Sequence, residues 1–513
     1  MEKVFVTALA FFLVVAGSPQ KTKKPNIVMI VADDLGWNDV GFHGSKQIPT
    51  PNIDRLATEG IILNNYYVLP ICTPTRSAIM TGRYGIHTGM QTSTIFAPNA
   101  WAVGLNETFL PQHLKSLGYK THAIGKWHLG FYAKEFTPTY RGFDSFYGYY
   151  EGKSDYWSHG NYETYWGLDL HDNMDPVYNQ WGNYSTEMYT AETEARIRDH
   201  DTSEPLFIYL AYQAVHSANT PADPIQAPAS WIKKFSHIKS EGRRKFAAVT
   251  AYMDYGIGRV YDALSKKGIL DNTVIVFTTD NGGPSNGFDF NYANNWPLRG
   301  VKASVWEGGV RAVGFIHSKL LKSPGRVSMD LFHCTDWLPT LVSIAGGDIP
   351  AEGSNLDGYS IWNSLQNDTP SPRSEVLLNI DPFAWKNAAL RVGDWKIVEG
   401  QGRSWGGWYN IPDSTMENHI HFYPTSNGSV KCGPVPENPT YCDKDHGPCL
   451  FNVNEDPCEF HDLSKTEPEL MHYMMTRLDQ YRKTMVPSRR NQTTDPLSNP
   501  KLHNGVWVPW RKP

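Results

Sequence analysis

Four segments of the chain are apolar runs that end abruptly in polar residues. They are NIVMIVADD (26–34), YKTHAIGKWH (119–128), PLFIYLAYQAVH (205–216) and TVIVFTTDNGG (273–283). Continuous apolar runs are typical of strands that are buried on both faces, and helical patterns such as that of residues 241–267 lie between them. We therefore predict an α/β domain, in which helices cover a large sheet.

The polar residues at the ends of these runs carry the candidate chemistry. In an α/β sheet the site lies beyond the carboxyl ends of the strands, so side chains from separate runs meet there. Each one also has a structural explanation: an aspartate can cap a helix, Asp-Asn can form a turn, and a histidine can be a satisfied core residue. Their joint occurrence at strand ends favours a functional site. The residues are Asp33, Asp34, Lys126, His128, His216, Asp280 and Asn281.

The pattern changes beyond about residue 370. A linker is indicated first, then strands, then a polar amphipathic helix over about 467–485. We predict a catalytic domain over residues 24–370 and a smaller α+β domain over 371–513, with an antiparallel sheet and one helix. The segments behind this interpretation are the linker PSPRSEVLLNI (370–380) and the strands ALRVGDWKIVEG (389–400) and LFNVNEDP (450–457).

The start of the chain predicts entry into the secretory route. Lys3 precedes an apolar run from Val4 to Val15, and small residues follow, as in a cleaved signal peptide over residues 1–17. This run is too short to cross a bilayer and no later segment is apolar for long enough, so we expect no membrane span. We expect a lysosomal or secreted glycoprotein. Glycosylation triplets begin at Asn106, Asn183, Asn367, Asn427 and Asn491.

Composition narrows the class of partner. Hydrophobic residues make up 40% of the 513 and charged residues 19%, which indicates a globular chain. The formal net charge is −5 and no basic face is visible, so we expect no nucleic-acid partner. The 18 histidines would add positive charge in an acidic compartment, where an anionic substrate is favoured.

The cysteines point to one unusual position. Cys334 lies where a helix is expected to begin and is interpreted as a buried free thiol. Cys72, in ICTPTRSAIMTGRYGIHTG (71–89), is then left without a partner, which favours a chemical role. The other four could form two disulfides in any of three connectivities: Cys432, Cys442, Cys449 and Cys458.

The segment around Cys72 resembles the sulfatase family. C-T-P-T-R at 72–76 resembles the family pattern C-x-P-S/T-R, and GRYGIHTG resembles its second signature. PNIVMIVADDLG, GKWHLG, TDNGG and GDWK occur in the family's order, and the resemblance covers about residues 25–481. It implies an alkaline-phosphatase-like fold: a large mixed sheet flanked by helices, plus a smaller C-terminal antiparallel sheet with one helix.

Three further segments resemble the arylsulfatase B type within this family. They are RGFDSFYGY, SDYWSH and NNWPLRGVKASVWEGGVR. The resemblance implies a sulfuric ester hydrolase that removes sulfate from N-acetylgalactosamine 4-sulfate in glycosaminoglycans and from aryl sulfates.

The family converts its motif cysteine to formylglycine, which implies that a formylglycine-generating enzyme acts on Cys72. A hydrated aldehyde has two hydroxyls on one carbon, so one can attack sulfur and the other can lose its proton to expel sulfate. A serine sulfate would have no such exit. Cys72 just before a helix, with Pro74 in the first turn, would lie beside unpaired backbone N–H groups.

The resemblance also implies one calcium ion per chain. Asp33, Asp34, Asp280 and Asn281 offer hard oxygen ligands, to which modified Cys72 would add another. Adjacent aspartates point to opposite sides of a regular strand, so both can reach one ion only where the strand has ended.

The remaining roles follow from the resemblance. Arg76 would balance the negative charge and hold the hydrate, while Lys126 and His128 would orient it and take its proton. His216 and Lys302 would bind sulfate and protonate the departing alcohol.

Two other functions stay open at this point. A phosphate-ester hydrolase of the same fold would use serine or threonine and usually two zinc ions, and the Cys72 motif argues against it. A secreted glycan-binding protein would keep the pocket without turnover, and the complete set of motif residues argues against that.

Overall fold

The structure is a computed structural model that describes residues 23–349, 355–401, 405–412 and 428–512. The predicted signal peptide and the glycosylation triplet at Asn427 lie outside the described residues. Asn106, Asn183 and Asn367 are exposed, and Asn491 is partly exposed.

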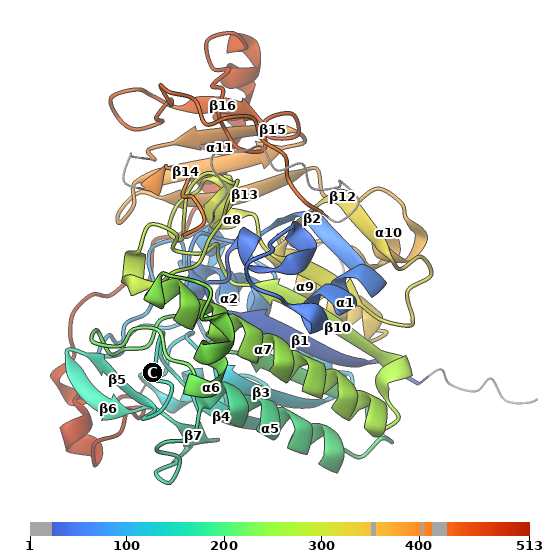
Figure 1. Ribbon diagram of the computed structural model, residues 1–513, viewed down its shortest axis with the longest axis vertical. Helices are drawn as coiled ribbons and strands as arrows, with labels where there is room; N and C mark the ends of the chain where they lie inside the picture. The colour runs from blue at the N-terminus through green and yellow to red at the C-terminus, as the bar shows by residue number, and fades with distance from the viewer. Residues whose placement is uncertain (1–22, 350–354, 402–404, 413–427, 513) are drawn as a thin grey trace, which may run out of the picture.

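A mixed sheet of ten strands forms the centre of the larger domain (Figure 1). The four predicted runs form β1, β3, β9 and β10, which are neighbours in this sheet and parallel to one another, whereas β11 runs antiparallel to β10. In spatial order the strands are β12 (Arg326–His333), β2 (Ile61–Tyr67), β11 (Gly314–His317), β10 (Thr273–Thr279), β1 (Asn26–Ala32), β9 (Leu206–Ala211), β3 (Lys120–Lys126), β4 (Ser145–Tyr149), β7 (His171–Asp172) and β8 (Asp175–Pro176).

Helices cover both faces of this sheet. Strand β1 shows why, because Val28 and Ile30 pack into one hydrophobic core while Ile27 and Met29 pack into the other. The first core is covered by α1 (Pro51–Glu59), α5 (Ser185–Asp199) and α7 (Glu241–Lys266), beside which lies the short α6 (Ala229–Ile232). The second is covered by α2 (Cys72–Thr81), α4 (Leu110–Ser116) and α9 (Trp337–Ile344).

Shorter elements connect these layers. They are α3 (Gly85–Thr88), α8 (Glu307–Val310), α10 (Trp362–Asn367) and the hairpin of β5 (Gly160–Glu163) and β6 (Tyr165–Leu168).

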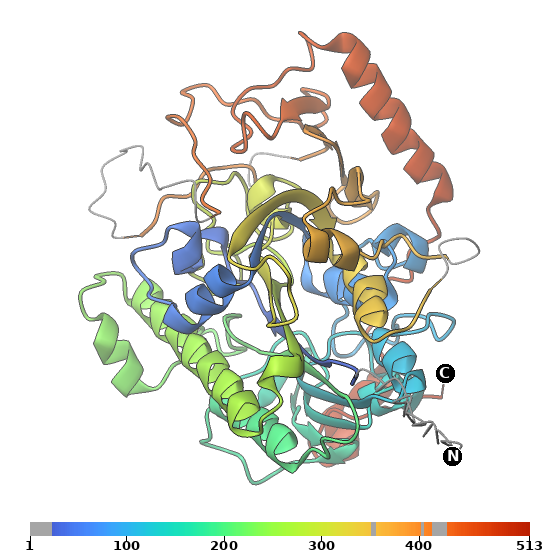
Figure 2. The ribbon, with the colours of Figure 1, turned by 90° about the vertical axis from the view of Figure 1, so that its right-hand side faces the viewer.

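A second, antiparallel sheet of four strands forms the smaller unit: β13 (Glu375–Asp381), β14 (Asn387–Val392), β15 (Trp395–Glu399) and β16 (Cys449–Asn452). The segment predicted as a linker over 370–380 is largely strand, because β13 pairs along its length with β14. The predicted helix is α11 (Pro468–Thr484), which stands apart from the large sheet in Figure 2.

The two faces of this second sheet have different partners. Leu390 and Ile397 pack against Leu478 of α11, whereas Ala389 and Val398 pack against the large domain around Trp306. The cysteines pair as Cys432–Cys458 and Cys442–Cys449, and Cys72 and Cys334 are buried free thiols.

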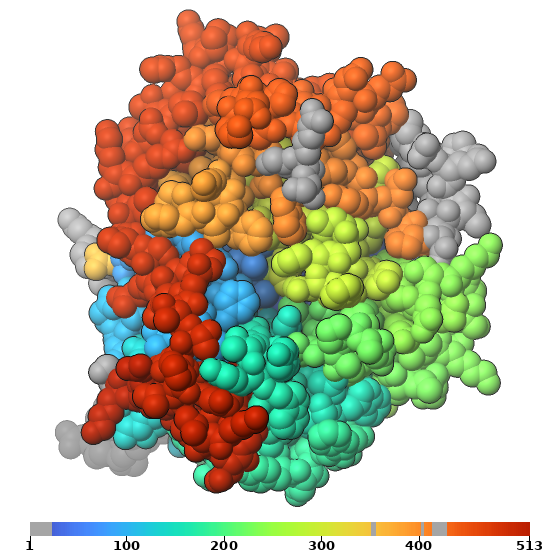
Figure 3. All heavy atoms as spheres, turned by 90° about the vertical axis from the view of Figure 1, so that its left-hand side faces the viewer, coloured from blue at the N-terminus to red at the C-terminus, as the bar shows by residue number. Residues whose placement is uncertain are grey.

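The end of the chain returns to the large domain. After α11, the Val486 N–H donates to the Ile86 carbonyl, and Thr494 forms a β-bridge with Asn99. Trp507 is fully buried in the core of the large sheet. Figure 3 shows this segment running down one face of the molecule from the smaller unit onto the larger one.

Candidate active site

All of the predicted site residues come together at the carboxyl ends of the central strands. Asp33 and Asp34 follow β1, and Asp280 and Asn281 follow β10. The ends of β3 and β9, the start of α2 and the loop before α8 supply the rest. Every one of these side chains belongs to a residue that is at most 5% exposed. Besides the three aspartates and Asn281, the residues of this set are Cys72, Arg76, Lys126, His128, His216 and Lys302.

The chain turns sharply after β1. Asp34 has a φ of 62°, in the left-handed region that residues other than glycine seldom occupy. Asp33 accepts a hydrogen bond from Lys126 Nζ at 2.6 Å, while Asp34 accepts from Lys302 Nζ at 2.8 Å. Both carboxylates therefore face one site, although neighbours within a strand would point apart.

Three carboxylates are matched by three cations. Besides the two lysine pairs, Arg76 NH2 lies 2.8 Å from Asp280 Oδ2 and 3.8 Å from Asp33 Oδ2. His216 Nε2 lies 3.2 Å from Lys302 Nζ and 3.5 Å from Asp34 Oδ2. The cluster is thus balanced in charge while excluded from water, as buried charges must be.

Burial and neighbouring charges separate the acidities of these groups. Burial, with a contribution from Asp280, raises the pKa of Asp33 to about 8. Burial also acts to raise the pKa of Asp280, but Arg76 and the lysines outweigh it and bring the value to about 2. Burial followed by Lys302 lowers the pKa of His216 to about 4.

Cys72 is the first residue of α2 and is almost completely buried. Its Sγ lies 3.7 Å from Asp33 Oδ1. Burial first, and then Asp280, raise the pKa of the thiol well above its usual range. The side chain is therefore a thiol and not a thiolate, which makes it a poor nucleophile in this form. The first N–H groups of a helix have no acceptor within the helix and favour an anion.

His128 faces the same space from the end of β3. Its Nε2 lies 3.0 Å from the Ile95 carbonyl, and its Nδ1 has no hydrogen-bond partner among the described residues. Burial, and next Lys126, lower its pKa well below the usual range. Gly152 lies against the ring, where a Cβ would come within 2.7 Å of imidazole atoms. The imidazole is therefore neutral and held in place.

The donor atoms fit a hard divalent cation. Ligand atoms of Asp33, Asp34, Cys72 and His216 lie within 4.8 Å of one another. Asn281 donates its amide to Asp34 Oδ1 at 2.7 Å, and its own Oδ1 is buried without a hydrogen-bond partner among the described residues. Carboxylate and amide oxygens are what calcium prefers. His216 was not predicted as a ligand, yet it belongs to this compact group.

A cavity of about 430 Å³ opens beside these residues. Cys72, His128, His216 and Lys302 line it, and so do side chains that the sequence did not single out. Figure 3 shows these parts of the chain meeting on one face. The additional side chains include Lys153, Glu163, Phe288, Asp289, Trp385, Arg490 and Gln492.

Asp289 is one of the residues that sequence reasoning missed. Its carboxylate lies 3.6 Å from Lys302 Nζ, and its φ of 55° turns the loop after β10 toward the cavity. The local segment GFDFNY contains no pattern that would have distinguished this aspartate from a solvated one.

The mixed ten-stranded sheet with its smaller antiparallel companion is the predicted alkaline-phosphatase-like fold. A family model described as Sulfatase matches residues 25–347. The chain belongs to the sulfatase family and is a sulfuric ester hydrolase.

Individual relatives extend over nearly the whole chain. Arylsulfatase J of Mus musculus is 42% identical over 96% of this chain and 81% of its own length. N-acetylgalactosamine-6-sulfatase of Homo sapiens is 27% identical over 92% of this chain and 88% of its own. The solved structure of Ps i-CgsB has 28% identity and a TM-score of 0.76, with coverage of 94% and 98%, and the protein was also solved in complex with k-i-k-neocarrahexaose.

Within the part of the chain that the structure describes, no helix is both long and apolar enough to span a bilayer.

Proposed function

We propose that this sulfatase acts through formylglycine at position 72 and one calcium ion, and that its substrate is a sulfated glycosaminoglycan, with aryl sulfates as alternative substrates. The single observation that carries the proposal is the position of Cys72: it begins a helix beside three buried carboxylates and three buried cations. The family membership favours a sulfate ester over the phosphate ester of the alternative reading.

The modified residue would supply a hydrated aldehyde, whose one hydroxyl attacks sulfur and whose other later allows sulfate to leave. Arg76 and Lys126 hold positive charge next to this position, since each pairs with a buried aspartate. His128 offers a neutral Nδ1 without a partner, which suits a group that takes a proton.

Calcium would be held by Asp33, Asp34, Asp280, Asn281 and an oxygen of modified Cys72, and it would draw negative charge from the sulfate oxygens. The unpartnered Asn281 Oδ1 supports this assignment.

His216 and Lys302 lie on the cavity side of Asp34 and are proposed to act on the leaving group. Their close contact, 3.2 Å between Nε2 and Nζ, places an imidazole and a fixed cation together, and the proposed protonation of the leaving group falls to this pair. A sugar alcohol needs that proton more than an aryl oxide does, because an alkoxide is the poorer leaving group.

The glycan assignment rests on relatives and on the cavity. Two relatives bear names or ligands that are carbohydrate-based: N-acetylgalactosamine-6-sulfatase, and Ps i-CgsB with its neocarrahexaose. The cavity combines cations with the aromatic rings of Phe288 and Trp385, a combination that suits an anionic sugar. We propose N-acetylgalactosamine 4-sulfate as the sulfated unit and a lysosomal or secreted location, with glycosaminoglycan degradation as the process.

The test is made on protein from secretory cells. Mass spectrometry of the peptide with residue 72 should find formylglycine, and elemental analysis should find one calcium per chain. Nitrocatechol sulfate and chondroitin fragments sulfated at position 4, 6 or 2 then serve as substrates. Active protein whose residue 72 is wholly unmodified thiol would contradict the mechanism. Turnover of the aryl ester with no turnover of any glycan would contradict the substrate class alone.

A further inference from the structure

We infer that the C-terminal segment builds a second anion subsite in the active-site cavity, with Arg490 and Lys153 as its cations. This subsite would bind a carboxylate or sulfate on the sugar next to the one that is desulfated. The inference rests on the proposed glycan substrate and deepens it by naming the residues that select among glycans.

The segment that carries Arg490 is held at both ends. Before it, the Arg489 N–H donates to the Gly89 carbonyl at 2.9 Å, and Gln91 Nε2 donates to the Val486 carbonyl at 3.0 Å. After it, the Asp495 N–H donates to the Pro98 carbonyl at 2.8 Å. Residues 490–493 are therefore a short stretch between two anchored points.

The anchors belong to the loop that lines the cavity. Residues 86–99 receive the C-terminal segment on one side, and Ser93, Thr94 and Phe96 of the same loop line the cavity on the other. Arg490 and Gln492 line it too, although they lie more than 400 residues from Cys72. The position of Arg490 relative to the cavity is thus set by main-chain hydrogen bonds on both sides of it and by one from the Gln91 side chain.

Arg490 has no acidic partner among the described residues. Its guanidinium lies next to the Gln492 side chain, which accepts from Arg490 Nε at 3.2 Å when the amide is oriented with its oxygen inward. The adjacent Arg489 differs, because it points away from the cavity and donates to the Thr88 carbonyl and to Asn106 Oδ1, both at 3.2 Å. Of these two consecutive arginines, only Arg490 faces the cavity.

Lys153 is the second free cation. It lines the cavity from the loop after β4 and forms no ion pair within 4.0 Å with any described residue. The carboxylates that share the cavity are already engaged: Glu163 accepts from the Ala97 N–H at 2.7 Å, and Asp289 lies 3.6 Å from Lys302 Nζ.

The balance of charge explains why a second anion fits here. Around Cys72 each cation is neutralised by a buried aspartate, whereas Arg490 has no such partner and Lys153 acts on Glu163 and Asp289 only from beyond ion-pair distance. A guanidinium binds a carboxylate or sulfate through two parallel hydrogen bonds, and a lysine adds a point charge. A substrate with a single anionic group would leave both cations unused.

The test compares three substrates. They are nitrocatechol sulfate, a disaccharide of uronic acid and 4-sulfated N-acetylgalactosamine, and the same disaccharide with the carboxylate reduced to a hydroxymethyl group. For Arg490→Ala we expect kcat/KM for the native disaccharide, relative to nitrocatechol sulfate, to fall about tenfold, chiefly through KM. Arg490→Lys should keep part of this ratio, and Lys153→Ala should lower it less than Arg490→Ala does.

Arg489→Ala is the matched control, since it removes a neighbouring arginine that faces away from the cavity. It should leave the ratio unchanged. An equal loss in Arg489→Ala would mean that detachment of the C-terminal segment causes the effect, and would overturn the inference. So would an Arg490→Ala variant that affects the native and the reduced disaccharide equally.

Two further measurements ask whether a sulfate can replace the carboxylate and whether the subsite can be tested if no glycan is cleaved. A carboxyl-reduced disaccharide with a second sulfate tests whether sulfate can replace the carboxylate. If wild type cleaves nitrocatechol sulfate but neither disaccharide, the proposed glycan substrate fails, and inhibition of nitrocatechol sulfate hydrolysis by the two disaccharides decides the subsite. A preference of about tenfold for the carboxylated inhibitor that Arg490→Ala abolishes supports the subsite, and equal inhibition overturns it.

Discussion

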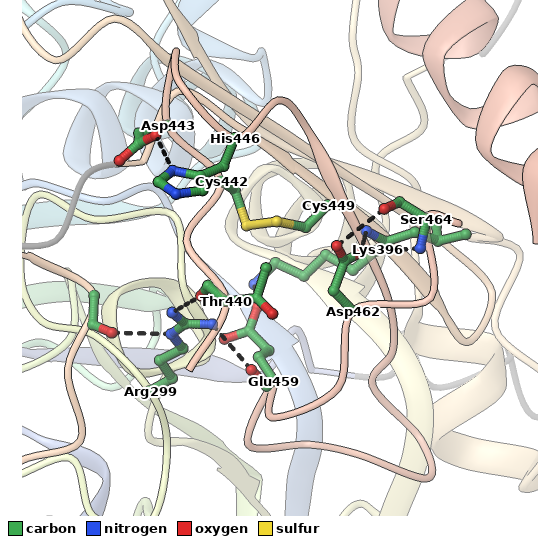
Figure 4. The surroundings of a disulfide bond; sticks show 12 residues. Arg299, Lys396, Thr440, Cys442, Asp443, His446, Cys449, Glu459, Asp462 and Ser464 are labelled. Atoms are coloured by element: carbon green, nitrogen blue, oxygen red, sulfur yellow. Dashed lines mark hydrogen bonds and ion pairs between the residues drawn. A yellow bond between two sulfur atoms is a disulfide. The ribbon is translucent and has the colours of Figure 1, made fainter. Parts of the chain in front are cut away.

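Two clusters of buried charges in this protein have similar composition, but one is closed off by its own protein contacts and the other opens to a cavity. The site cluster pairs carboxylates with cations at the carboxyl ends of β1, β10 and β3, beside the cavity. The docking cluster joins the second sheet to the large domain, and Figure 4 shows part of it near the Cys442–Cys449 disulfide. The site cluster is Asp33, Asp34, Asp280, Arg76, Lys126 and Lys302, and the docking cluster is Glu307, Lys396, Glu459, Tyr67 and Arg391.

The docking cluster is closed by groups of the protein itself. Lys396 Nζ lies 2.9 Å from Glu307 Oε1 and 2.8 Å from Glu459 Oε1. Tyr67 donates to Glu307 Oε2 at 2.7 Å, and the Glu307 N–H donates to Glu459 Oε2 at 2.8 Å. Every carboxylate oxygen of the cluster thus has a hydrogen-bond or ion-pair partner in the protein, and Glu459 Oε1 has the ion pair with Lys396 without a hydrogen bond. Such a network can fix how two units meet, but has no place for a ligand.

In the site cluster, by contrast, not every buried polar atom has a partner in the protein. Asn281 Oδ1 is buried without a partner among the described residues, and Cys72 and Lys302 face the cavity. The comparison teaches that a count of buried charges does not identify a functional site. The distinguishing features are the unpartnered donor atom and the access to a cavity.

The largest effect should follow from Cys72→Ser, which removes the proposed precursor of the nucleophile. Turnover of nitrocatechol sulfate should fall by roughly a thousandfold or more, while far-ultraviolet circular dichroism stays that of the folded enzyme. Cys334→Ser is the matched control, because Cys334 is also a buried free thiol but lies outside the cavity. A Cys72→Ser enzyme with a tenth of the wild-type activity would contradict the prediction.

Next in size is Lys396→Met in the docking cluster. It leaves Glu307 and Glu459 buried with no lysine between them, so the free energy of unfolding in urea should fall by about 3–5 kcal/mol. Lys444→Met is the control, since the Lys444 side chain is 87% exposed and its ion pair with Asp445 should contribute little. Equal unfolding midpoints for the two variants would show that the docking cluster does not hold the second sheet.

Removal of calcium should act on the site cluster alone. At a calcium concentration about a hundred times the dissociation constant, binding adds about 2.7 kcal/mol to the free energy of unfolding, and a chelator should remove this gain. Asp34→Asn should reduce the response to calcium, whereas Lys396→Met should retain it. Identical unfolding curves for wild type with calcium and with chelator would rule out the proposed ion.

The smallest effect concerns pH and the docking cluster. Burial, offset by Lys396 and reinforced by Glu307, raises the pKa of Glu459 from 4.5 to about 7. The folded state then binds more protons than the unfolded state between those values, so this group's contribution to stability is present below pH 4.5 and is lost as pH rises through 7. Glu459 therefore stabilises the folded protein most in an acidic medium.

Glu459→Gln tests this sign. Between pH 4.5 and 7.5 the wild type should lose on the order of 2 kcal/mol more free energy of unfolding than the variant, because other titrating groups are common to both. Urea unfolding at several pH values measures the difference. Parallel profiles, or a variant that loses more than wild type, would contradict the assignment.

Local patterns determined a large part of this protein. The four apolar runs form adjacent strands. A strand covered on both faces must be apolar throughout, and this can be recognised from consecutive residues of the sequence. Their polar ends converge for a simple topological reason, since these strands are parallel and end at one edge. Cys72 at the start of α2 follows equally from local sequence, and so does helix α11.

Only the tertiary structure decided the contacts between distant segments. Lys396 lies between Trp395 and Ile397 in β15 and resembles a solvent-facing lysine, but docking of the sheet places it between two glutamates. The segment 375–381 is strand because β14 pairs with it, and the choice among three disulfide connectivities depends on which cysteines packing brings together. Arg490 belongs to the same group. The sequence around it is that of a polar terminal segment. It lines the cavity because hydrogen bonds to residues 86–99 hold that segment there. The periodicity of apolar residues indicates which face of a helix or strand is buried. Which segment packs against that face depends on the free energy of the whole fold.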